Sequence, residues 1–210
     1  MPPRHFFERP SMIRARFGTL RGLIRLALSY PQLILGLSAS RAPDAGAVRR
    51  LVFVCQGNIC RSAFADIVAQ KAGLRAASFG LSTTTGRAAH GPAIAAARAL
   101  GHDLSHHRAV DLADYAPEPG DLLLAMEVRQ LHRLAADPRL AHLPRMLLGR
   151  WTRPILPHLH DPYQLDDRYM TRCLRRIDGA VAALVTAFPA ARLCASSATD
   201  PAPRDADRTK

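Results

Sequence analysis

The chain has 210 residues, 48% of them hydrophobic and 6% aromatic, which is enough for the core of one domain of ordinary size with extra segments at its ends. Its four cysteines, Cys55, Cys60, Cys173 and Cys194, show neither paired CxxC motifs nor a regular framework, which argues against a disulfide-stapled secreted fold and a zinc site and favours a reducing compartment. The formal net charge is +12, and residues 1–50 carry +7 of it, which favours an acidic partner such as a membrane surface, a nucleic acid or an acidic protein. Only two of the 29 basic residues are lysines, and such arginine richness also follows from the nucleotide composition of a genome.

Residues 1–47 read as a basic amphipathic extension, a helix followed by a linker. Apolar residues recur at helical spacing at Ile13, Phe17, Leu20, Ile24 and Leu28, and arginines lie on an adjoining face at Arg14, Arg21 and Arg25. Pro31 is expected to kink or end this helix.

The uncharged run from Leu26 to Ser40 bears on how this extension is placed. It spans 15 residues, which is short for a transmembrane helix of about 20 apolar residues, and a signal peptide would have an unusually long charged leader. Two placements remain, a helix lying in a membrane interface and a helix packed on the protein's own domain. The basic flank favours the membrane interface.

Residues 48–188 are expected to form the main domain, and residues 189–210, which are small, polar and proline-containing, a disordered tail. The predicted strands are Leu51–Val54, Ala77–Gly80, Asp121–Ala125 and Arg145–Leu148, and the predicted helices cover residues 61–72, 92–100, 127–136 and 166–188. Short apolar runs that alternate with helices predict an α/β fold with a buried parallel sheet.

The string LVFVCQGNICRS, residues 51–62, carries the strongest chemical signal. A tight loop between a strand and a helix N-terminus aims successive backbone N–H groups at one point and favours an anion the size of phosphate. Such a positive field lowers the pKa of a thiol, so Cys55 is a candidate nucleophile. The Arg61 guanidinium can hold two phosphate oxygens, and Ser62 can donate a hydrogen bond to the Cys55 sulfur.

Together with a downstream His160-Asp161-Pro162-Tyr163, this string resembles the active site of the low-molecular-weight protein tyrosine phosphatases. In that family an Asp-Pro-Tyr motif before the last helix supplies the general acid, and the likeness covers roughly residues 48–188. The resemblance implies a four-stranded parallel sheet with helices on both faces.

The resemblance also implies a role for each residue of the motifs. Cys55 attacks phosphorus, Arg61 clamps the phosphate, and Asp161 protonates the leaving phenolate oxygen and then activates water. The phosphate-binding residues are Gln56, Gly57, Asn58, Ile59, Cys60, Arg61 and Ser62. No metal and no cofactor is implied, because the loop itself neutralises the phosphate.

Other residues are expected around this site. Ser78 and His107 would help Asn58 to hold the loop, although His107 could equally be an ordinary satisfied histidine, and Tyr163 would flank the substrate ring. Cys60 either traps the nucleophile in a reversible disulfide, as a second loop cysteine does in the family, or packs behind the loop. Asp166 and Asp167 stand at a helix start and are expected to cap it.

Substrate and location follow from one further likeness. The loop Leu81–Gly86 lacks the aromatic residue of eukaryotic relatives and is closer to bacterial members associated with capsule and exopolysaccharide production. The resemblance therefore implies a phosphotyrosine protein substrate, such as a membrane tyrosine kinase of polysaccharide production. It implies a cytoplasmic enzyme, with peripheral contact of the extension to an anionic membrane and no role in nucleic-acid binding.

Two other functions stay open. Thioredoxin-coupled arsenate reductases share the loop, but they need two further cysteines to relay a disulfide, and none lies between Cys60 and Cys173. A phosphoprotein-binding module with weak or lost catalysis would not need Cys55, Arg61 and Asp161 all intact.

Overall fold

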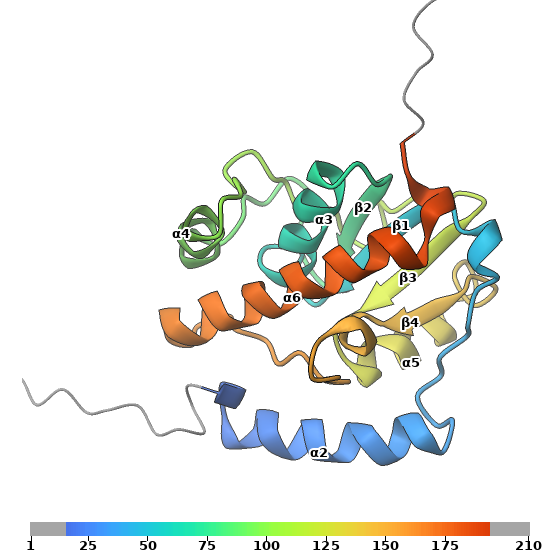
Figure 1. The fold of residues 1–210 in the computed structure, drawn as a ribbon, viewed down its shortest axis with the longest axis horizontal. Coiled ribbons are helices and arrows are strands. Elements are labelled where there is room, and N and C mark those ends of the chain that lie inside the picture. The colour runs from blue at the N-terminus through green and yellow to red at the C-terminus, as the bar shows by residue number, and fades with distance from the viewer. Residues whose placement is uncertain (1–15, 194–210) are drawn as a thin grey trace, which may run out of the picture.

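The computed structural model describes residues 16–193, which form an α/β domain with a helix, α2, laid against it (Figure 1). The helices are α2 (Leu20–Ile34), α3 (Arg61–Lys71), α4 (Gly91–Ala99), α5 (Val128–Ala136) and α6 (Asp167–Ala187). The strands are β1 (Arg50–Cys55), β2 (Ala76–Gly80), β3 (Asp121–Ala125) and β4 (Arg145–Leu147). Each predicted element of the main domain is confirmed within one residue at either end.

The four strands form one parallel sheet in the order β2-β1-β3-β4, as the resemblance implied. β1 is central and pairs Val52 with Ala77 on one side and with Leu123 on the other. Its apolar run is buried on both faces, because helices cover both sides of the sheet. The carboxyl end of β1 therefore lies between those of β2 and β3, at the edge of the sheet where open parallel sheets bind ligands.

Alternate side chains of the strands enter two separate cores. Phe53 and Leu124 point to the face covered by α3, α4 and α6, whereas Val54 and Leu123 point to the face covered by α5. The alternation follows from the two-residue period of a strand. Figure 1 shows the long helix α6 lying across one face and α5 lying on the other.

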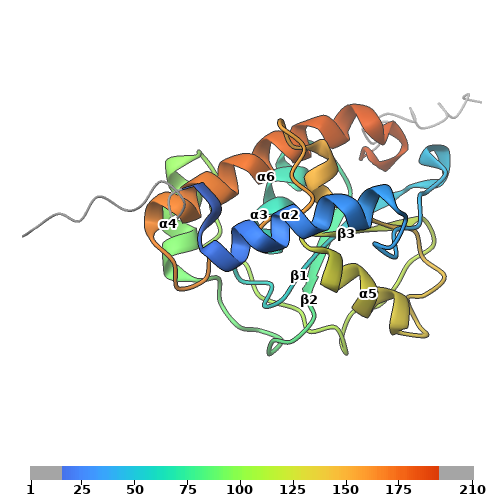
Figure 2. The ribbon, with the colours of Figure 1, turned by 90° about the horizontal axis from the view of Figure 1, so that it is seen from below.

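The α2 helix packs on the domain, and Figure 2 shows it running between α6 and α5. Gly22, Leu26 and Ser29 form its buried side, and the Tyr30 hydroxyl donates to the Ile155 carbonyl at 2.7 Å. The opposite side stays exposed, with Leu20 62%, Ile24 52% and Ile34 81% accessible. Two residues of the expected amphipathic helix lie outside the described residues: Ile13 of its apolar stripe and Arg14 of its arginine face.

The α2 helix does not end at Pro31, which was one of the two expected effects of this proline, but continues through it to Ile34. A proline ring is tolerated there because position 31 faces solvent, and the residues around it are anchored: Ser29 is buried and Tyr30 is hydrogen-bonded to the domain. Among residues 16–193, no helix combines the length and the apolar character that crossing a bilayer requires.

The ordered chain also extends beyond the expected start of the tail. Residues Pro189–Ala191 form a 3-10 turn, Ala191 is buried, and the Leu193 N–H donates to the Gly73 carbonyl at 2.8 Å. Apolar contacts of Phe188 and Ala191 with the α3–β2 junction account for this difference. The rest of the expected tail, with Cys194, lies outside the described part of the chain.

Candidate active site

The loop between β1 and α3 surrounds the thiol of Cys55. The Cys55 sulfur lies 3.0 Å from the Ser62 hydroxyl oxygen and accepts the Asn58 backbone N–H at 3.2 Å. Cys55 ends a buried strand and Arg61 begins a helix, so the intervening backbone turns sharply around the sulfur. Two donors beside one sulfur stabilise a thiolate over a thiol.

Asn58 holds the loop in this shape. Its φ of +50° lies in the left-handed region, which Asn tolerates better than most residues. Its side-chain amide donates to Ser62 Oγ at 2.8 Å and to Ser78 Oγ at 2.9 Å, and its carbonyl oxygen accepts the Val110 N–H at 2.9 Å. One fully buried side chain thus ties the loop to β2 and to the segment after α4.

Asp66 and His107 surround Asn58 from two sides. Ser78 donates its hydroxyl to Asp66 Oδ2 at 2.8 Å, and burial raises the pKa of that carboxyl. His107 Nε2 lies 2.8 Å from the backbone carbonyl oxygen of Asn58, and burial lowers the pKa of the imidazole. The structure therefore brings Asn58, Ser78 and His107 together behind the loop, whereas His106 is exposed.

The Arg61 guanidinium is buried and lies between two carboxylates. One terminal nitrogen donates to Glu127 Oε1 at 2.6 Å and to the Leu159 carbonyl at 2.8 Å, and the other lies 2.7 Å from Asp161 Oδ2. Arg61 Nε has no hydrogen-bond partner within residues 16–193. A buried donor without a partner is costly, so this nitrogen is a site for an incoming anion.

Glu127 fixes the charge of Arg61. Burial opposes ionisation of its carboxyl, but the ion pair with Arg61 and the hydrogen bond from Arg129 outweigh it and lower the pKa to about 2. For Arg61 itself burial also opposes the charge, and Asp161 and Glu127 together keep its pKa well above the ordinary value.

Asp161 faces the cavity that opens over the sulfur. That cavity has a volume of about 170 Å³ and is lined by Cys55, Gln56, Gly57, Ile59, Cys60, Ser82, Arg87, Asp161 and Tyr163. The Tyr163 ring is 38% exposed and lies 4.8 Å from the His90 ring between centroids, so it forms one side of the entrance. Asp166, in contrast, caps α6 by accepting the Tyr169 N–H at 2.7 Å, which confirms its expected role.

Comparison with known proteins accounts for this arrangement. Residues 50–193 match the family model described as low molecular weight phosphotyrosine protein phosphatase. The chain belongs to this phosphatase family. It is therefore an enzyme of the phosphoric monoester hydrolase class, and the resemblance read from its motifs is confirmed.

Individual relatives are covered over most of their own length. The chain is 29% identical over 136 residues to the low-molecular-weight protein-tyrosine-phosphatase Ptp of Acinetobacter johnsonii, covering 64% of this chain and 94% of the relative. It is 32% identical over 116 residues to Wzb of Escherichia coli K12, covering 54% and 78%. The solved tyrosine phosphatase amsI of Erwinia amylovora is 25% identical, with a TM-score of 0.60 and coverage of 71% and 99%.

Three features of this phosphatase site were not predicted from the sequence. Glu127 was read only as the start of a helix, and Arg87 and His90 were given no role, yet Glu127 binds Arg61, Arg87 lines the cavity and the His90 ring packs against Tyr163. For Glu127, a carboxylate directly after a buried strand, at the sheet edge where β1 also ends, was a usable signal. The other two offered none.

The described cysteines are buried and free. Burial, with the nearby Cys55, raises the pKa of Cys60 well above the ordinary value, and burial raises the pKa of Cys173 to about 12. Both groups are therefore neutral thiols at physiological pH. Cys55 alone among the described cysteines has a sulfur that faces paired donors in the cavity.

Proposed function

We propose that the enzyme hydrolyses phosphotyrosine in two steps, beginning with attack of the Cys55 thiolate on phosphorus. The sulfur–phosphorus bond forms as the bond to the phenolic oxygen breaks, and protonated Asp161 gives its proton to that oxygen. The loop N–H groups and the Arg61 guanidinium stabilise the charge on the phosphoryl oxygens. Supporting this is the single observation that Cys55 and Asp161 line one cavity and that the buried Arg61 guanidinium lies 2.7 Å from the Asp161 carboxylate.

In the second step, Asp161 takes a proton from water, which attacks phosphorus and releases the Cys55 thiolate. The Ser62 hydroxyl, 3.0 Å from the sulfur, stabilises the thiolate as it leaves. Arg61 keeps its place through both steps because Glu127 and the Leu159 carbonyl hold its other nitrogen. All groups needed for both half-reactions thus come from the loop and from residue 161.

A phosphotyrosine substrate suits the entrance of this cavity. Tyr163 and Ile59 provide apolar and aromatic walls against which a phenyl ring can pack above the sulfur. Arg87, at the rim, would attract acidic residues beside the phosphotyrosine. We propose a bacterial tyrosine kinase of polysaccharide production as the substrate, because the chain resembles Wzb and amsI.

The test is phosphate release from phosphotyrosine and phosphoserine peptides of one sequence, compared with reduction of arsenate in the presence of thioredoxin. We expect rapid release from phosphotyrosine, far less from phosphoserine, and no arsenate reduction. Arsenate reduction without phosphate release would identify the arsenate reductase, and tight phosphopeptide binding without turnover would identify the binding module.

Cys60 gives the site a protective disulfide in this proposal. A peroxide oxidises the Cys55 thiolate to a sulfenic acid, and the Cys60 thiol condenses with it, releasing water and forming the disulfide. A thiol reductant then restores both cysteines. Activity lost to peroxide should be recovered with reductant in the unaltered protein but not in Cys60→Ser, and equal recovery in both would mean that Cys60 only packs behind the loop.

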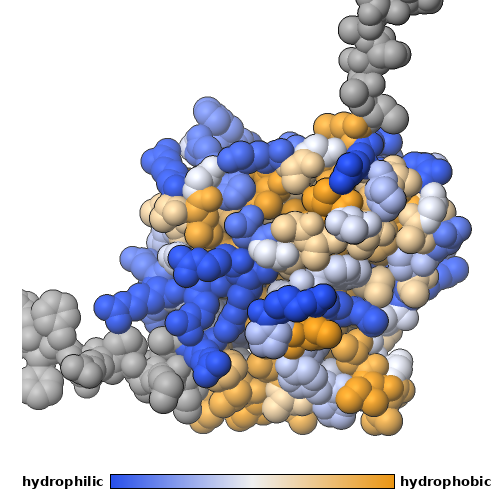
Figure 3. Space-filling model, in the orientation of Figure 1, coloured by the Kyte–Doolittle hydropathy of each residue, from blue (hydrophilic) through white to orange (hydrophobic). Residues whose placement is uncertain are grey.

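We also propose that the exposed side of α2 rests on an anionic membrane. Leu20, Ile24 and Ile34 form an uncovered apolar strip, and Figure 3 shows apolar side chains gathered along α2 below a band of hydrophilic ones. A neighbouring cavity is lined by Arg153, Arg172, Arg175 and Arg176. Each basic residue near an anionic leaflet contributes about 1 kcal/mol, so a few arginines and a modest apolar strip support reversible binding.

Vesicle flotation separates this from a purely structural α2. The full-length protein should float with anionic vesicles at low salt, not with neutral ones, and Ile24→Gln with Ile34→Gln should abolish flotation. Leu193→Gln, which alters an apolar residue of similar exposure far from α2, is the matched control. Absence of flotation with anionic vesicles would contradict membrane contact.

A further inference from the structure

The segment that carries Asp161 is held from outside the family domain. His160, its immediate neighbour, lies between the start of α2 and the start of α6. Its Nε2 lies 3.0 Å from the Thr19 hydroxyl oxygen, and the Tyr169 ring packs on the other side, 6.3 Å between ring centroids. The family model begins at residue 50, so α2 is an addition of this chain that contacts the acid loop.

Two glycines let α2 approach His160 closely. A Cβ on Gly22 would lie 2.8 Å from His160 Cγ and 2.5 Å from the Phe17 carbonyl oxygen, and one on Gly18 would lie 2.9 Å from His160 Cδ2. Gly18 has a φ of +79°, a conformation that also favours glycine. Any side chain at Gly22 would therefore push α2 and the imidazole apart.

Thr19 joins the two elements chemically. Its hydroxyl oxygen caps α2 by accepting the Gly22 N–H at 2.9 Å, and the same oxygen reaches His160. The position of the imidazole is thus fixed by the first turn of the helix. The imidazole is confined between Thr19 and the Tyr169 ring, so we infer that a push on it is passed to the backbone of His160, which one planar peptide joins to Asp161.

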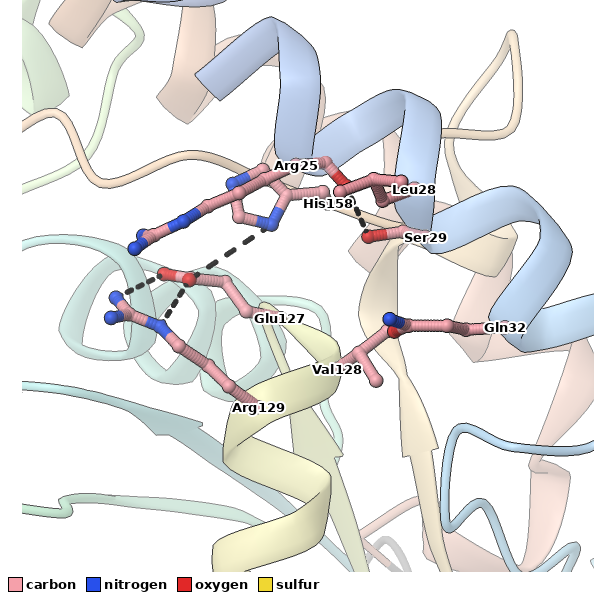
Figure 4. A pocket seen from close by; sticks show the side chains of 8 residues that line it. All are labelled: Arg25, Leu28, Ser29, Gln32, Glu127, Val128, Arg129 and His158. Atoms are coloured by element: carbon pink, nitrogen blue, oxygen red, sulfur yellow. Dashed lines mark hydrogen bonds and ion pairs between the residues drawn. The ribbon is translucent and has the colours of Figure 1, made fainter. Parts of the chain in front are cut away.

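Further along α2, a second group of its residues faces His158, which lies two residues before His160. Figure 4 shows a pocket in which Arg25, Ser29 and Gln32 of α2 face Glu127, Arg129 and His158. His158 Nδ1 lies 3.9 Å from Glu127 Oε2, and Glu127 holds Arg61. The α2 helix therefore lies beside both histidines that precede Asp161, His158 and His160.

We propose that α2 positions the general acid: Thr19 and Gly22 place His160, and His160 places Asp161 for proton transfer. This rests on the proposed role of Asp161. Thr19 and Gly22 touch no reacting atom, so they are positioning residues. A displacement of the acid slows departure of basic leaving groups, which need the proton, and barely affects acidic ones, which depart without it.

The test compares Gly22→Ala with unaltered full-length protein on a series of aryl phosphates of increasing phenol pKa. Geometry errors of about 1 Å can cost on the order of 10²-fold, so we expect kcat/KM, which reports the steps up to phenol release, to fall at least about tenfold for the most basic phenols and less than about twofold for the most acidic. Gly179→Ala, in α6 with no atom near the added carbon, is the matched control and should leave the series unchanged.

Thr19→Val and Thr19→Ser provide an independent pair. Valine keeps the shape of the side chain but loses the hydroxyl, so Thr19→Val should steepen the dependence of the rate on phenol pKa. Serine keeps the hydroxyl, so Thr19→Ser should show the dependence of the unaltered protein. The thermal unfolding temperature is measured for all variants, because a purely structural α2 would lower it without steepening the dependence.

Two results separate the inference from the function beneath it. If Asp161→Ala steepens the dependence but Gly22→Ala and Thr19→Val do not, α2 does not position the acid and the inference is overturned. If Asp161→Ala itself leaves the dependence unchanged, the assignment of the general acid fails first.

Discussion

The phosphate loop and the acid loop meet over the same cavity, but they are held in different ways. The phosphate loop is continuous with β1 and α3, and the buried Asn58 alone bonds it to Ser62, Ser78 and Val110. The acid loop has no regular structure between residues 158 and 165, and its His160 is held by Thr19 of the α2 N-terminus and by the Tyr169 ring of α6.

The bonds that hold the phosphate loop lie within the phosphatase domain, whereas the acid loop is also held by α2, which lies outside that domain. A loop fixed by buried bonds within its own domain keeps the same phosphate cradle whatever lies outside the domain. A loop fixed by distant elements can be moved by changes in those elements. We expect substitutions in the first to affect binding and chemistry together, and substitutions around the second to affect proton transfer alone.

Removal of the nucleophile should have the largest effect. Cys55→Ser should lower kcat by at least about 10⁴-fold, since a serine hydroxyl is a far weaker nucleophile, while phosphate or vanadate binding persists because the loop amides remain. Calorimetric titration with phosphate measures the binding. Substantial phosphatase activity in Cys55→Ser would refute the mechanism.

Loss of the acid should come next and should depend on the leaving group. Asp161→Ala should lower kcat/KM, which reports the steps up to phenol release, by about 10²–10⁴-fold for aryl phosphates with basic phenols and much less for those with acidic phenols. Steady-state values of kcat/KM across the series measure this. A uniform loss would give Asp161 a structural role and direct attention to Asp166 and Asp167.

The bonds of Asn58 can be separated from its backbone conformation. Asn58→Gly and Asn58→Ala both lose the amide, leaving buried groups unpaired at a cost of about 1–3 kcal/mol, and both should lower kcat/KM. Alanine should cost about 1 kcal/mol more than glycine, because φ is +50° there. Urea unfolding compares the two, and equal stabilities would mean that the backbone relaxes out of the left-handed region.

Protonation of His158 in the acid loop should lower the free energy of unfolding in mild acid. Burial lowers the pKa of His158 to about 4, whereas an unfolded histidine titrates near 6.5. Its contribution to stability is therefore complete above about pH 6.5 and is lost as the pH falls toward 4, a loss of about 3 kcal/mol. Glu127, with a pKa of about 2, changes mainly below this window.

Denaturant unfolding at several pH values measures this dependence, with His158→Gln as the comparison. The glutamine variant should show a smaller decline between pH 6.5 and 4, and the part that remains comes from His107 and His160, whose pKa values burial also lowers. A decline of the same size in both proteins would place the titrating group elsewhere.

The sequence predicted the phosphate loop far better than the acid loop. Local strings carry the strand before Cys55, the left-handed Asn58 and the helix after Arg61, and the short apolar runs placed every strand within one residue. Asp161 was recognised from its neighbours Pro162 and Tyr163. Nothing local to residues 160–163 indicates that Thr19 would lie 3.0 Å away, since that contact joins residues 141 apart.

Pro31 illustrates the same boundary. A proline is a local signal for a helix end, but α2 is held on the domain by Ser29 and Tyr30, directly before the expected break. Tertiary anchoring overrides local preference here, because the lost backbone bond is small beside the packing of the helix.

The central claim is that phosphate passes through the Cys55 sulfur, and trapping that intermediate tests it most directly. Asp161→Ala protein is mixed with an aryl phosphate that has an acidic phenol, quenched within milliseconds to seconds by a denaturant at alkaline pH, digested, and analysed by mass spectrometry. The account predicts a phosphate adduct on the peptide that carries Cys55, which is absent from Cys55→Ser. An adduct on another residue, or continued turnover with no adduct at any time, would contradict it.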